Sequence, residues 1–381
     1  MNERSLLGPA DLSDGQLAFL VARGLGADPE RVTLLDSLAD AVDYALPSLT
    51  TAGRYWVDGH VSVDGEPQAF RVFCKHVQSW SRSPLFSFVP VDARPWAEVS
   101  VPWRTEPLVY RSDLARRLPD GLAMPRALGV FDLDETSSAV WLEALPVDAV
   151  EWDLPRYVHA ARLLGRLAAS PRVRELARIG RHPSTVRDYL SGRLRYQVLP
   201  TLRSDALWQH PLVAATFDRD LREGLRRVAE GAPQLMGELA GMPLGTAHGD
   251  ACPNNLLVSP GREGFVLIDF GFWSERPIGY DLAQLVVGEI QLGQRSAQDL
   301  AELDEACLEA YCEGLVAEGS SVATEVVRRA HALQLVLFNG LSSVPFELLG
   351  SPPTAEAHAV ARERSRIAAY SLDLLAATVP A

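Results

Sequence analysis

Three side chains with metal-binding oxygens, Asp250, Asn255 and Asp269, lie within the stretch HGDACPNNLLVSPGREGFVLIDFG. Between Asn255 and Asp269, two short apolar runs flank the turn-forming residues 259–264, and this pattern predicts a β-hairpin. Pairing across such a hairpin places Asn255 opposite Asp269, roughly 5 Å apart at Cβ. A carboxylate and an amide oxygen at that separation suit Mg²⁺, which also keeps waters and substrate phosphates as ligands. Asp250 precedes Asn255 by five residues and is close enough to face the same metal.

The spacing H-G-D-x-x-x-x-N followed by I-D-F-G resembles the catalytic and metal-binding motifs of kinase-fold phosphotransferases. Gly249 replaces the Arg of protein kinases, which makes the stretch similar to the aminoglycoside phosphotransferase and choline kinase-like family of small-molecule kinases. The resemblance implies an α+β, two-lobed protein-kinase-like fold with a β-rich N-lobe and a mostly helical C-lobe. It also implies that Asp250 accepts the proton of the substrate hydroxyl, and that Asn255 and Asp269 hold Mg²⁺. His248 is expected to support the loop through hydrogen bonds.

A single lysine, Lys75, stands among the 36 basic residues of the chain. Arg and Lys replace each other on most solvated surfaces, so this lysine suggests a position that needs a compact ammonium; chance survival is the alternative. The segment Val72-Phe73-Cys74-Lys75 resembles the V-A-I-K strand of kinases, whose Lys contacts the α- and β-phosphates. Phe73 departs from the small residue usual beside adenine, which leaves the shape of the adenine pocket open.

An acidic partner for Lys75 is expected on the helix that follows. The pattern predicts a helix over residues 103–118, with Glu106 in its first turn ahead of a proline that is tolerated there. We expect Glu106 to pair with Lys75, and Glu98 is the alternative.

The segments that position these groups are predicted to be strands and their connections. Residues 46–53 occupy the place of a phosphate-covering loop and offer Ser48 and Thr51, although a plain hairpin loop is an equal alternative. Residues 141–146 resemble the hinge between lobes, where backbone groups near Glu143 and Leu145 would hydrogen-bond the adenine edge. The predicted strands cover residues 38–46, 54–63, 69–77, 127–132 and 139–144.

The expected organisation is an N-terminal helical extension over residues 1–36, a nucleotide-binding N-lobe over 37–142 and a C-lobe over 143–381. The C-lobe would carry the catalytic loop, the metal site and the substrate-binding helices. Helices are predicted over residues 11–26, 153–169, 184–192 and 211–240, followed by three or four helices over 296–378.

Composition narrows the classes of partner. With 381 residues, 47% of them hydrophobic, the chain is long enough to bury a large core in two lobes. The net charge of −13 argues against nucleic acid as a partner. No apolar run has signal-peptide or membrane-spanning character, and the four cysteines lack metal or disulfide spacing. We therefore expect a cytoplasmic protein with free thiols, no membrane partner and an oligomeric state that the sequence leaves open.

The acceptor is expected to be a small molecule. Only nine residues separate Gly271 from Asp281, whereas protein kinases use a longer segment ending in A-P-E to bind a peptide. Acids crowd residues 299–313, where they either bind substrate amines or form the solvated face of a helix. The resemblance implies Mg²⁺-dependent transfer of the γ-phosphoryl group of ATP, with GTP as an alternative donor. The acceptor would be a hydroxyl of an antibiotic such as an aminoglycoside, or of a sugar or other metabolite. A catalytically weak pseudokinase that binds a nucleotide or a partner is the alternative.

Overall fold

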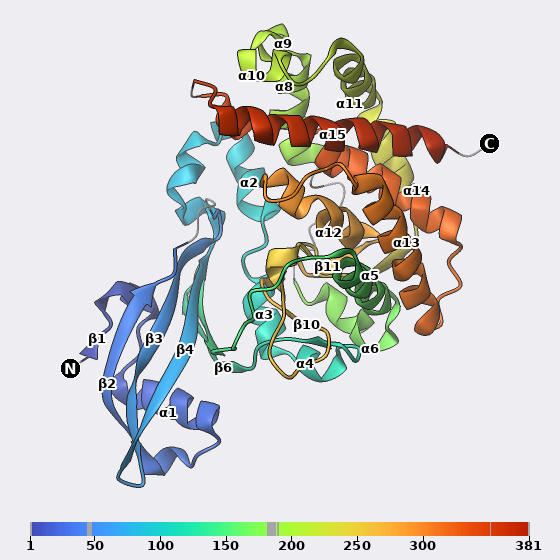
Figure 1. The fold of residues 1–381 in the computed structure, drawn as a ribbon. Coiled ribbons are helices and arrows are strands. Elements are labelled where there is room, and N and C mark those ends of the chain that lie inside the picture. Colours follow the sequence, from blue (N-terminus) through green and yellow to red (C-terminus); the bar gives the residue numbers. More distant parts are fainter. Residues whose placement is uncertain (1, 44–47, 181–187, 189, 351, 380–381) are drawn as a thin grey trace.

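The computed structural model describes residues 2–43, 48–180, 188, 190–350 and 352–379, and Figure 1 shows a sheet-rich N-terminal part beside a helical C-terminal part. This is the α+β architecture expected from the sequence, with a β-rich N-lobe and a mostly helical C-lobe. Within the described residues, no helix is long and apolar enough to cross a membrane.

A six-stranded sheet in the order β1-β2-β3-β4-β7-β6 forms the N-lobe. All neighbouring strands are antiparallel except β1, which runs parallel to β2. The β3–β4 hairpin turns through Asp64 and Gly65, both with positive φ, which matches the right-handed twist of the flanking strands. The strands are β1 (Asn2–Glu3), β2 (Val32–Ala41), β3 (Thr51–Val63), β4 (Glu66–Gln78), β6 (Ala127–Asp134) and β7 (Ser137–Glu143).

Strand β2 begins six residues earlier than the strand predicted over 38–46 and ends at Ala41, so that prediction was wrong at both bounds. The physical reason is the length of β3, whose last residue, Val63, still pairs with Val32. Sheet pairing therefore extends β2 into a segment whose own alternation of apolar and polar residues is weak. Residues 44–47, the end of the predicted strand and the start of the predicted phosphate loop, lie outside the described residues.

The N-terminal helix α1 (Asp14–Leu25) covers the outer face of the sheet. Ser13 and Gln16 form a reciprocal capping box at its start, and Gly26 ends it with a φ of 69°. Leu17 and Val21 are buried against the sheet residues Val57, Val61, Val72, Cys74 and Trp141. Burial of each such aliphatic side chain stabilises the fold by about 1.5–3 kcal/mol.

The single helix predicted over 103–118 is two short helices in the structure, α3 (Thr105–Arg111) and α4 (Leu114–Arg117). Ser112 breaks it in an extended conformation, and its hydroxyl accepts a hydrogen bond from the Leu114 amide. A serine hydroxyl that binds a nearby backbone amide competes with the continuing helix, which explains the interruption. Upstream, α2 (Arg94–Ser100) lies in the connection between β4 and α3.

In the C-lobe, the predicted helix over 153–169 is present as α5 (Leu154–Ala169), capped by Asp153. The predicted helix over 211–240 is interrupted, because Asp218 caps a new start for α11. Most of the range 184–192 lies outside the described residues. The other C-lobe helices are α6 (Pro171–Arg174), α8 (Leu199–Arg203), α9 (Asp205–Gln209), α10 (Pro211–Ala214), α11 (Arg219–Ala240), α12 (Tyr280–Gln291), α13 (Leu300–Ala317), α14 (Thr324–Gln334) and α15 (Ala355–Ala377).

Short strands form two further sheets, one of three strands and one of two. They are β5 (Leu122–Ala123), β8 (Leu244–Ala247), β9 (Leu256–Leu257), β10 (Phe265–Leu267) and β11 (Ser274–Pro277). The helix α15 runs between α8–α11 on one side and α12–α14 on the other (Figure 1).

The connection before α3 touches the C-lobe at Trp96, whose ring rests on Gly192. A Cβ atom at Gly192 would overlap the indole ring, so only glycine allows this approach. The contact joins α2 to the irregular helix Leu190–Val198.

We predict that Gly192→Ala destabilises the protein by about 1–3 kcal/mol, because the added methyl overpacks the contact with Trp96. The free energy of unfolding in urea measures the effect. The matched control is Gly231→Ala in α11, where a Cβ meets no atom within 4 Å. That control should be neutral or stabilising by up to about 1 kcal/mol. Equal effects of the two substitutions would contradict a tight contact at Gly192.

Candidate active site

The hairpin formed by β9 and β10 is shifted by one residue from the predicted register. Leu257 pairs with Val266 and Leu256 with Leu267, so Ile268 lies opposite Asn255 and donates its amide to the Asn255 carbonyl at 3.1 Å. The expected pairing of Asn255 with Asp269 was therefore wrong by one position. The hairpin is also short, because Val258 lies outside the ladder and its carbonyl accepts a hydrogen bond from the Asp148 amide at 2.9 Å.

Asp269 comes directly after this hairpin and turns toward the sheet of the N-lobe. Its backbone is left-handed, with φ of 62° and ψ of 64°, a conformation that Asp tolerates better than most residues. The turn brings its Oδ1 to 3.1 Å from the Nζ of Lys75. Burial works against ionisation of Asp269, but the charge and hydrogen bond of Lys75 lower its pKa below the ordinary value.

Lys75 is held between two acids from different parts of the chain. Its Nζ donates to the Oε2 of Glu106 on α3 at 2.6 Å, and both side chains are buried. The expected pairing of Lys75 with Glu106 is thus present, and Glu98, the alternative, lies exposed on α2. Burial alone would lower the pKa of Lys75, but Asp269 and Glu106 raise it above the ordinary value. The ammonium therefore stays charged at neutral pH.

Arg54 adds a second cation that the sequence analysis missed. It lies opposite Lys75 in the β3–β4 hairpin, and its Nη2 is 4.0 Å from the Oδ2 of Asp269. The sequence could have predicted this position. Residues that pair across the Asp64–Gly65 turn have numbers with a constant sum, and this rule places Arg54 opposite Lys75. Two cations next to Asp269 suit a polyanionic ligand such as a polyphosphate.

Asp250 and Asn255 lie together in the loop that precedes the hairpin. The Nδ2 of Asn255 donates to the backbone carbonyl of Asp250 at 2.8 Å and to its Oδ2 at 3.0 Å. This orientation leaves the Asn255 Oδ1 as the atom able to ligate a cation. Burial, together with the charge of Asp269, raises the pKa of Asp250 to about 6, which suits a group that takes up a proton near neutral pH.

The backbone of this loop is fixed by Asp281 at the start of α12. Its carboxylate accepts hydrogen bonds from the amides of His248 at 2.8 Å and Gly249 at 2.9 Å. The imidazole of His248, fully buried, contacts the Ile268 carbonyl at 2.9 Å, in keeping with the expected supporting role. Gly249 has a φ of 87°, and a Cβ there would clash with the Phe272 carbonyl, which explains why the protein-kinase Arg cannot occur here.

Aromatic contacts connect the three parts of the site. Phe270 packs edge-on against Tyr110 of α3, with ring centroids 5.6 Å apart, and lies 5.2 Å from the ring of His248. The ring of Phe270 thereby joins three elements. They are the helix that carries Glu106, the segment that carries Asp269 and the catalytic loop.

The predicted nucleotide-loop and hinge residues form hydrogen bonds of their own. The hydroxyl of Ser48 accepts a hydrogen bond from the Thr51 amide at 3.1 Å, which closes a turn at the start of β3. Glu143 forms two hydrogen bonds with Arg126. The Glu143 amide donates to the Arg126 carbonyl at 3.1 Å, and the Glu143 Oε1 accepts from the Arg126 amide at 2.9 Å. Leu145 follows the end of β7. No hydrogen bond or ion pair of the described residues joins these four residues to Lys75 or Asp269.

The donor atoms fit a hard divalent cation that shares its coordination with phosphates. The described residues contain no group of three or more His, Cys, Asp or Glu able to enclose a metal ion. The Asp269 carboxylate and the Asn255 amide oxygen instead provide two oxygen donors, and Mg²⁺ is usually bound by one or two carboxylates plus substrate phosphates.

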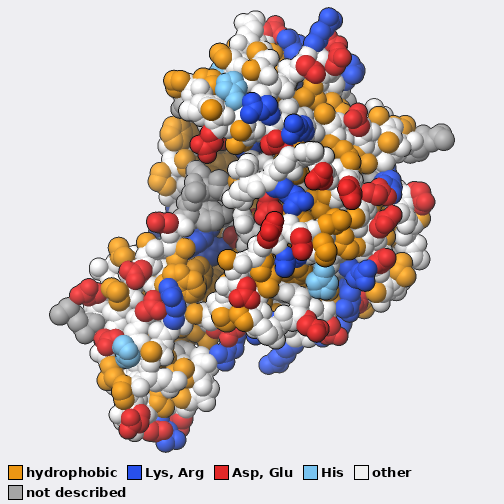
Figure 2. Space-filling view, viewed as in Figure 1, with side chains coloured by type: hydrophobic (Ala, Val, Ile, Leu, Met, Phe, Trp, Pro, Cys, Tyr) orange, Lys and Arg blue, Asp and Glu red, His pale blue; other side chains and the backbone are white. Residues whose placement is uncertain are grey.

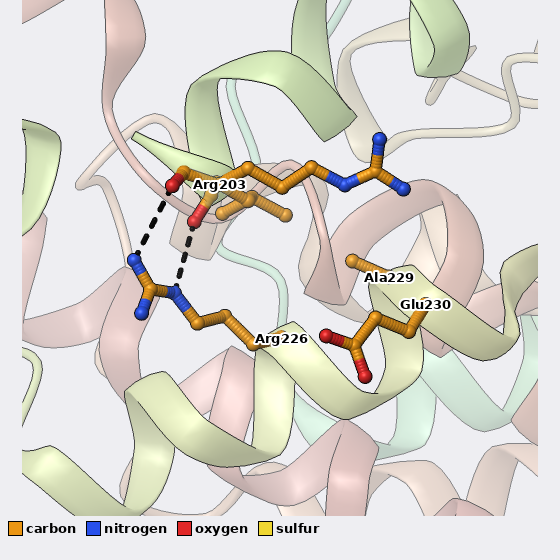
Figure 3. A pocket seen from close by; sticks show the side chains of 5 residues that line it. Arg203, Arg226, Ala229 and Glu230 are labelled. Atoms are coloured by element: carbon orange, nitrogen blue, oxygen red, sulfur yellow. Dashed lines mark hydrogen bonds between the residues drawn. The ribbon is translucent and has the colours of Figure 1, made fainter. Parts of the chain in front are cut away.

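The surface is hollowed where the sheet meets the helical part, as Figure 2 shows. Two pockets that are open to solvent lie elsewhere among the described residues. One, of about 200 Å³, is lined by Leu202, Arg203, Arg226, Ala229 and Glu230 (Figure 3). There Arg226 donates to the carbonyls of Leu202 and Arg203, so its guanidinium is already bound. The other, of about 440 Å³, lies between α11, α14 and the end of α15.

Several acids of residues 299–313 are bound to other residues of the protein. Asp304 is buried and accepts from the Tyr370 hydroxyl at 2.6 Å, while its other oxygen lies 2.7 Å from the Nε2 of His331. Glu305 pairs with Arg328. These contacts favour a structural role for the two acids over the binding of substrate amines.

The chain is similar to known proteins at the level of a family model and of solved structures. The model of the phosphotransferase enzyme family matches residues 111–320. No curated protein matched the chain. Among solved structures, an aminoglycoside phosphotransferase from Alicyclobacillus acidocaldarius is 16% identical, with 88% of this chain and 96% of that chain covered and a TM-score of 0.48. An ethanolamine kinase from Plasmodium vivax is 11% identical, with 96% and 90% covered and a TM-score of 0.46. An amicoumacin kinase is 14% identical, with 90% and 89% covered and a TM-score of 0.45.

Proposed function

Because the chain belongs to the phosphotransferase enzyme family, we propose that it transfers the γ-phosphoryl group of ATP, with Mg²⁺, to a hydroxyl of a small molecule. The observation that carries the proposal is the position of Lys75, which lies 2.6 Å from Glu106 and 3.1 Å from Asp269. An ammonium held in this way can bind phosphate oxygens without moving, because its acidic partners already fix its place.

In the proposed reaction, Asp250 accepts the hydroxyl proton as the acceptor oxygen bonds to the γ-phosphorus. The bond from that phosphorus to the bridging oxygen breaks, and ADP leaves with the electron pair. Lys75 and Arg54 bind the phosphates, while Asp269 and the Oδ1 of Asn255 would hold Mg²⁺. The metal, when bound, neutralises charge on the phosphates. Catalysis then depends on positioning and electrostatics.

The base of the nucleotide would lie along the end of β7. The Glu143 amide is occupied by the Arg126 carbonyl, so the Glu143 carbonyl and the Leu145 amide are the backbone groups proposed for the base edge. Ser48 and Thr51 are proposed to border the phosphates from the start of β3. ATP and GTP differ at the edge that such backbone groups contact. Binding measurements with each nucleotide therefore distinguish the two donors.

Nucleotide binding and turnover test the proposal separately. ATP and GTP should each be added with Mg²⁺ or with EDTA, and the thermal midpoint should rise with the true donor only when Mg²⁺ is present. ADP formation should then be followed across aminoglycosides, sugars and other hydroxylated metabolites, with casein as the protein control. Stabilisation by nucleotide without ADP formation from any acceptor would favour a pseudokinase. Absence of nucleotide binding would refute the proposed function, and labelling of casein would refute the small-molecule acceptor.

We further predict that Lys75→Arg lowers kcat/KM for ATP by on the order of 10- to 100-fold, in a protein that remains folded. The guanidinium is larger and planar, and the space between Glu106 and Asp269 holds a compact ammonium at 2.6 Å and 3.1 Å. Steady-state kinetics measure the loss, and circular dichroism checks the fold. An Arg variant as active as the parent would mean that the only lysine persists by chance.

A further inference from the structure

Three arginines are buried in the described part of the chain, and one of them differs from the others. Arg4 binds Asp11, Asp14 and Ser37, and Arg329 binds Glu238 through two nitrogens at 2.7 and 2.8 Å. Arg276 is only 3% exposed, yet none of the hydrogen bonds or ion pairs of the described residues includes its side chain. Its Nε is fully buried and has no hydrogen-bond partner there.

An aromatic ring lies against this guanidinium, and the charges of Arg276 and the buried Asp281 also interact. The central carbon of the guanidinium lies 4.9 Å from the ring centroid of Tyr280, which is a cation–π distance. The ring itself packs edge-on against Phe338, with centroids 5.6 Å apart. An aromatic face offsets only part of the cost of taking a cation out of water, and buried charges are normally paired and hydrogen-bonded. The guanidinium therefore has unused donors that suit an anion from outside the chain.

The position of Arg276 relates it to the catalytic loop. It lies on β11, where it pairs with Gly245 on β8, and β8 leads directly into His248. Tyr280, whose ring lies against Arg276, is followed by Asp281, the residue that binds the amides of that loop. The cations proposed for the nucleotide, Lys75 and Arg54, belong instead to the N-lobe sheet. The charges of Arg276 and Asp250 both act on Tyr280, so Arg276 lies in the C-lobe close to the catalytic loop.

We propose that the acceptor carries an anionic group, a carboxylate or a phosphate, which Arg276 binds while a hydroxyl of the same molecule faces Asp250. This inference rests on the proposed function and names the class of its acceptor. The fork of a guanidinium matches the two oxygens of either anion. Polycationic acceptors such as aminoglycosides would be repelled by Arg276, whose charge takes part in no ion pair of the described residues. Hydroxy acids and sugar phosphates become the expected substrates.

The stability of matched variants tests whether Arg276 lacks a partner in the protein. Arg276→Met should leave the thermal midpoint unchanged or raise it, because it removes a buried charge without breaking a pair. Arg329→Met, the matched control, should lower the midpoint because it leaves Glu238 without its ion pair. Equal destabilisation by the two substitutions would overturn the inference and give Arg276 a structural role.

Anion binding is tested with acetate and inorganic phosphate as probes, each compared with chloride at equal ionic strength. One or both probes should raise the midpoint of the parent more than that of Arg276→Met, and the preferred probe separates a carboxylate site from a phosphate site. Arg276→Lys should keep part of the response. Identical responses of the parent and Arg276→Met would overturn the inference.

Turnover completes the test with gluconate, glucose 6-phosphate, glucose and kanamycin as acceptors. ADP formation should favour an anionic member of this set, and Arg276→Met should raise its KM by on the order of 10²-fold. A preference for kanamycin or glucose that Arg276→Met leaves unchanged would overturn the inference. Stabilisation of both proteins by Mg·ATP shows that the nucleotide site is intact, so failure here is distinct from failure of the proposed function.

Discussion

Replacement of Asp250 by Asn should lower kcat by on the order of 10²- to 10⁴-fold, because a general base acts mainly in the transition state. The affinity for Mg·ATP should change little, since the nucleotide is assigned to Lys75, Arg54 and Asp269. The substitution preserves shape. An amide oxygen at this position can still accept the hydrogen bond that Asn255 donates at 3.0 Å, so the loop should keep its conformation.

The pH profile adds a second measurement to this prediction. The pKa of Asp250 is raised to about 6 by burial and by the charge of Asp269. A base must be deprotonated to act, so kcat/KM of the parent should fall as the pH is lowered through this value. The residual activity of Asp250→Asn should lack that limb. A variant that retains more than half of the parental kcat, or that keeps the same pH profile, would remove Asp250 from the role of base.

The proximity of residues that belong to short sequence motifs could be predicted from the sequence alone. Asp250, Asn255 and Asp269 lie near one another because few residues separate them in the sequence. The hairpin between Asn255 and Asp269 forms from contacts between residues that are close in the chain. The partner of Lys75 was also predictable. A buried ammonium requires an acid, and Glu106 lies on the first helix after the strand that carries Lys75. The structure joins these two at 2.6 Å.

What the sequence could not predict depends on packing between distant segments. The β9–β10 hairpin ends at Leu257, and the next residue, Val258, binds Asp148, a residue far away in the chain. The early start of β2 depends on the length of its partner β3. Arg276 appeared as one arginine among many, and only its burial without an ion pair in the described structure distinguishes it. Such features follow from tertiary contacts that local propensity does not encode.

Replacement of Asp269 by Ala should abolish the effect of Mg²⁺ on nucleotide binding, lowering the affinity for Mg·ATP by at least about 10²-fold, because the site loses its charged metal ligand. In EDTA the sign of the effect should reverse. Asp269 stands 3.1 Å from Lys75 and 4.0 Å from Arg54, so its removal frees positive charge for the triphosphate. Asp269→Ala should then bind metal-free ATP at least as tightly as the parent does.

Calorimetric titration of the protein with ATP, once with Mg²⁺ and once with EDTA, measures both effects. Two further variants serve as comparisons for the loss of the Asp269 carboxylate. Asn255→Ala should weaken Mg·ATP binding less than Asp269→Ala, since an amide contributes a dipole rather than a charge. It should also lower kcat, because Asp250 loses a hydrogen bond of 3.0 Å. Asn254→Ala is the matched control, because this neighbouring amide is exposed. If Mg·ATP binds equally to the parent and to Asp269→Ala, then Asp269 holds no metal. The two cations beside it would bind the phosphates without one, and the role of Asp269 would be to keep Lys75 charged and in place.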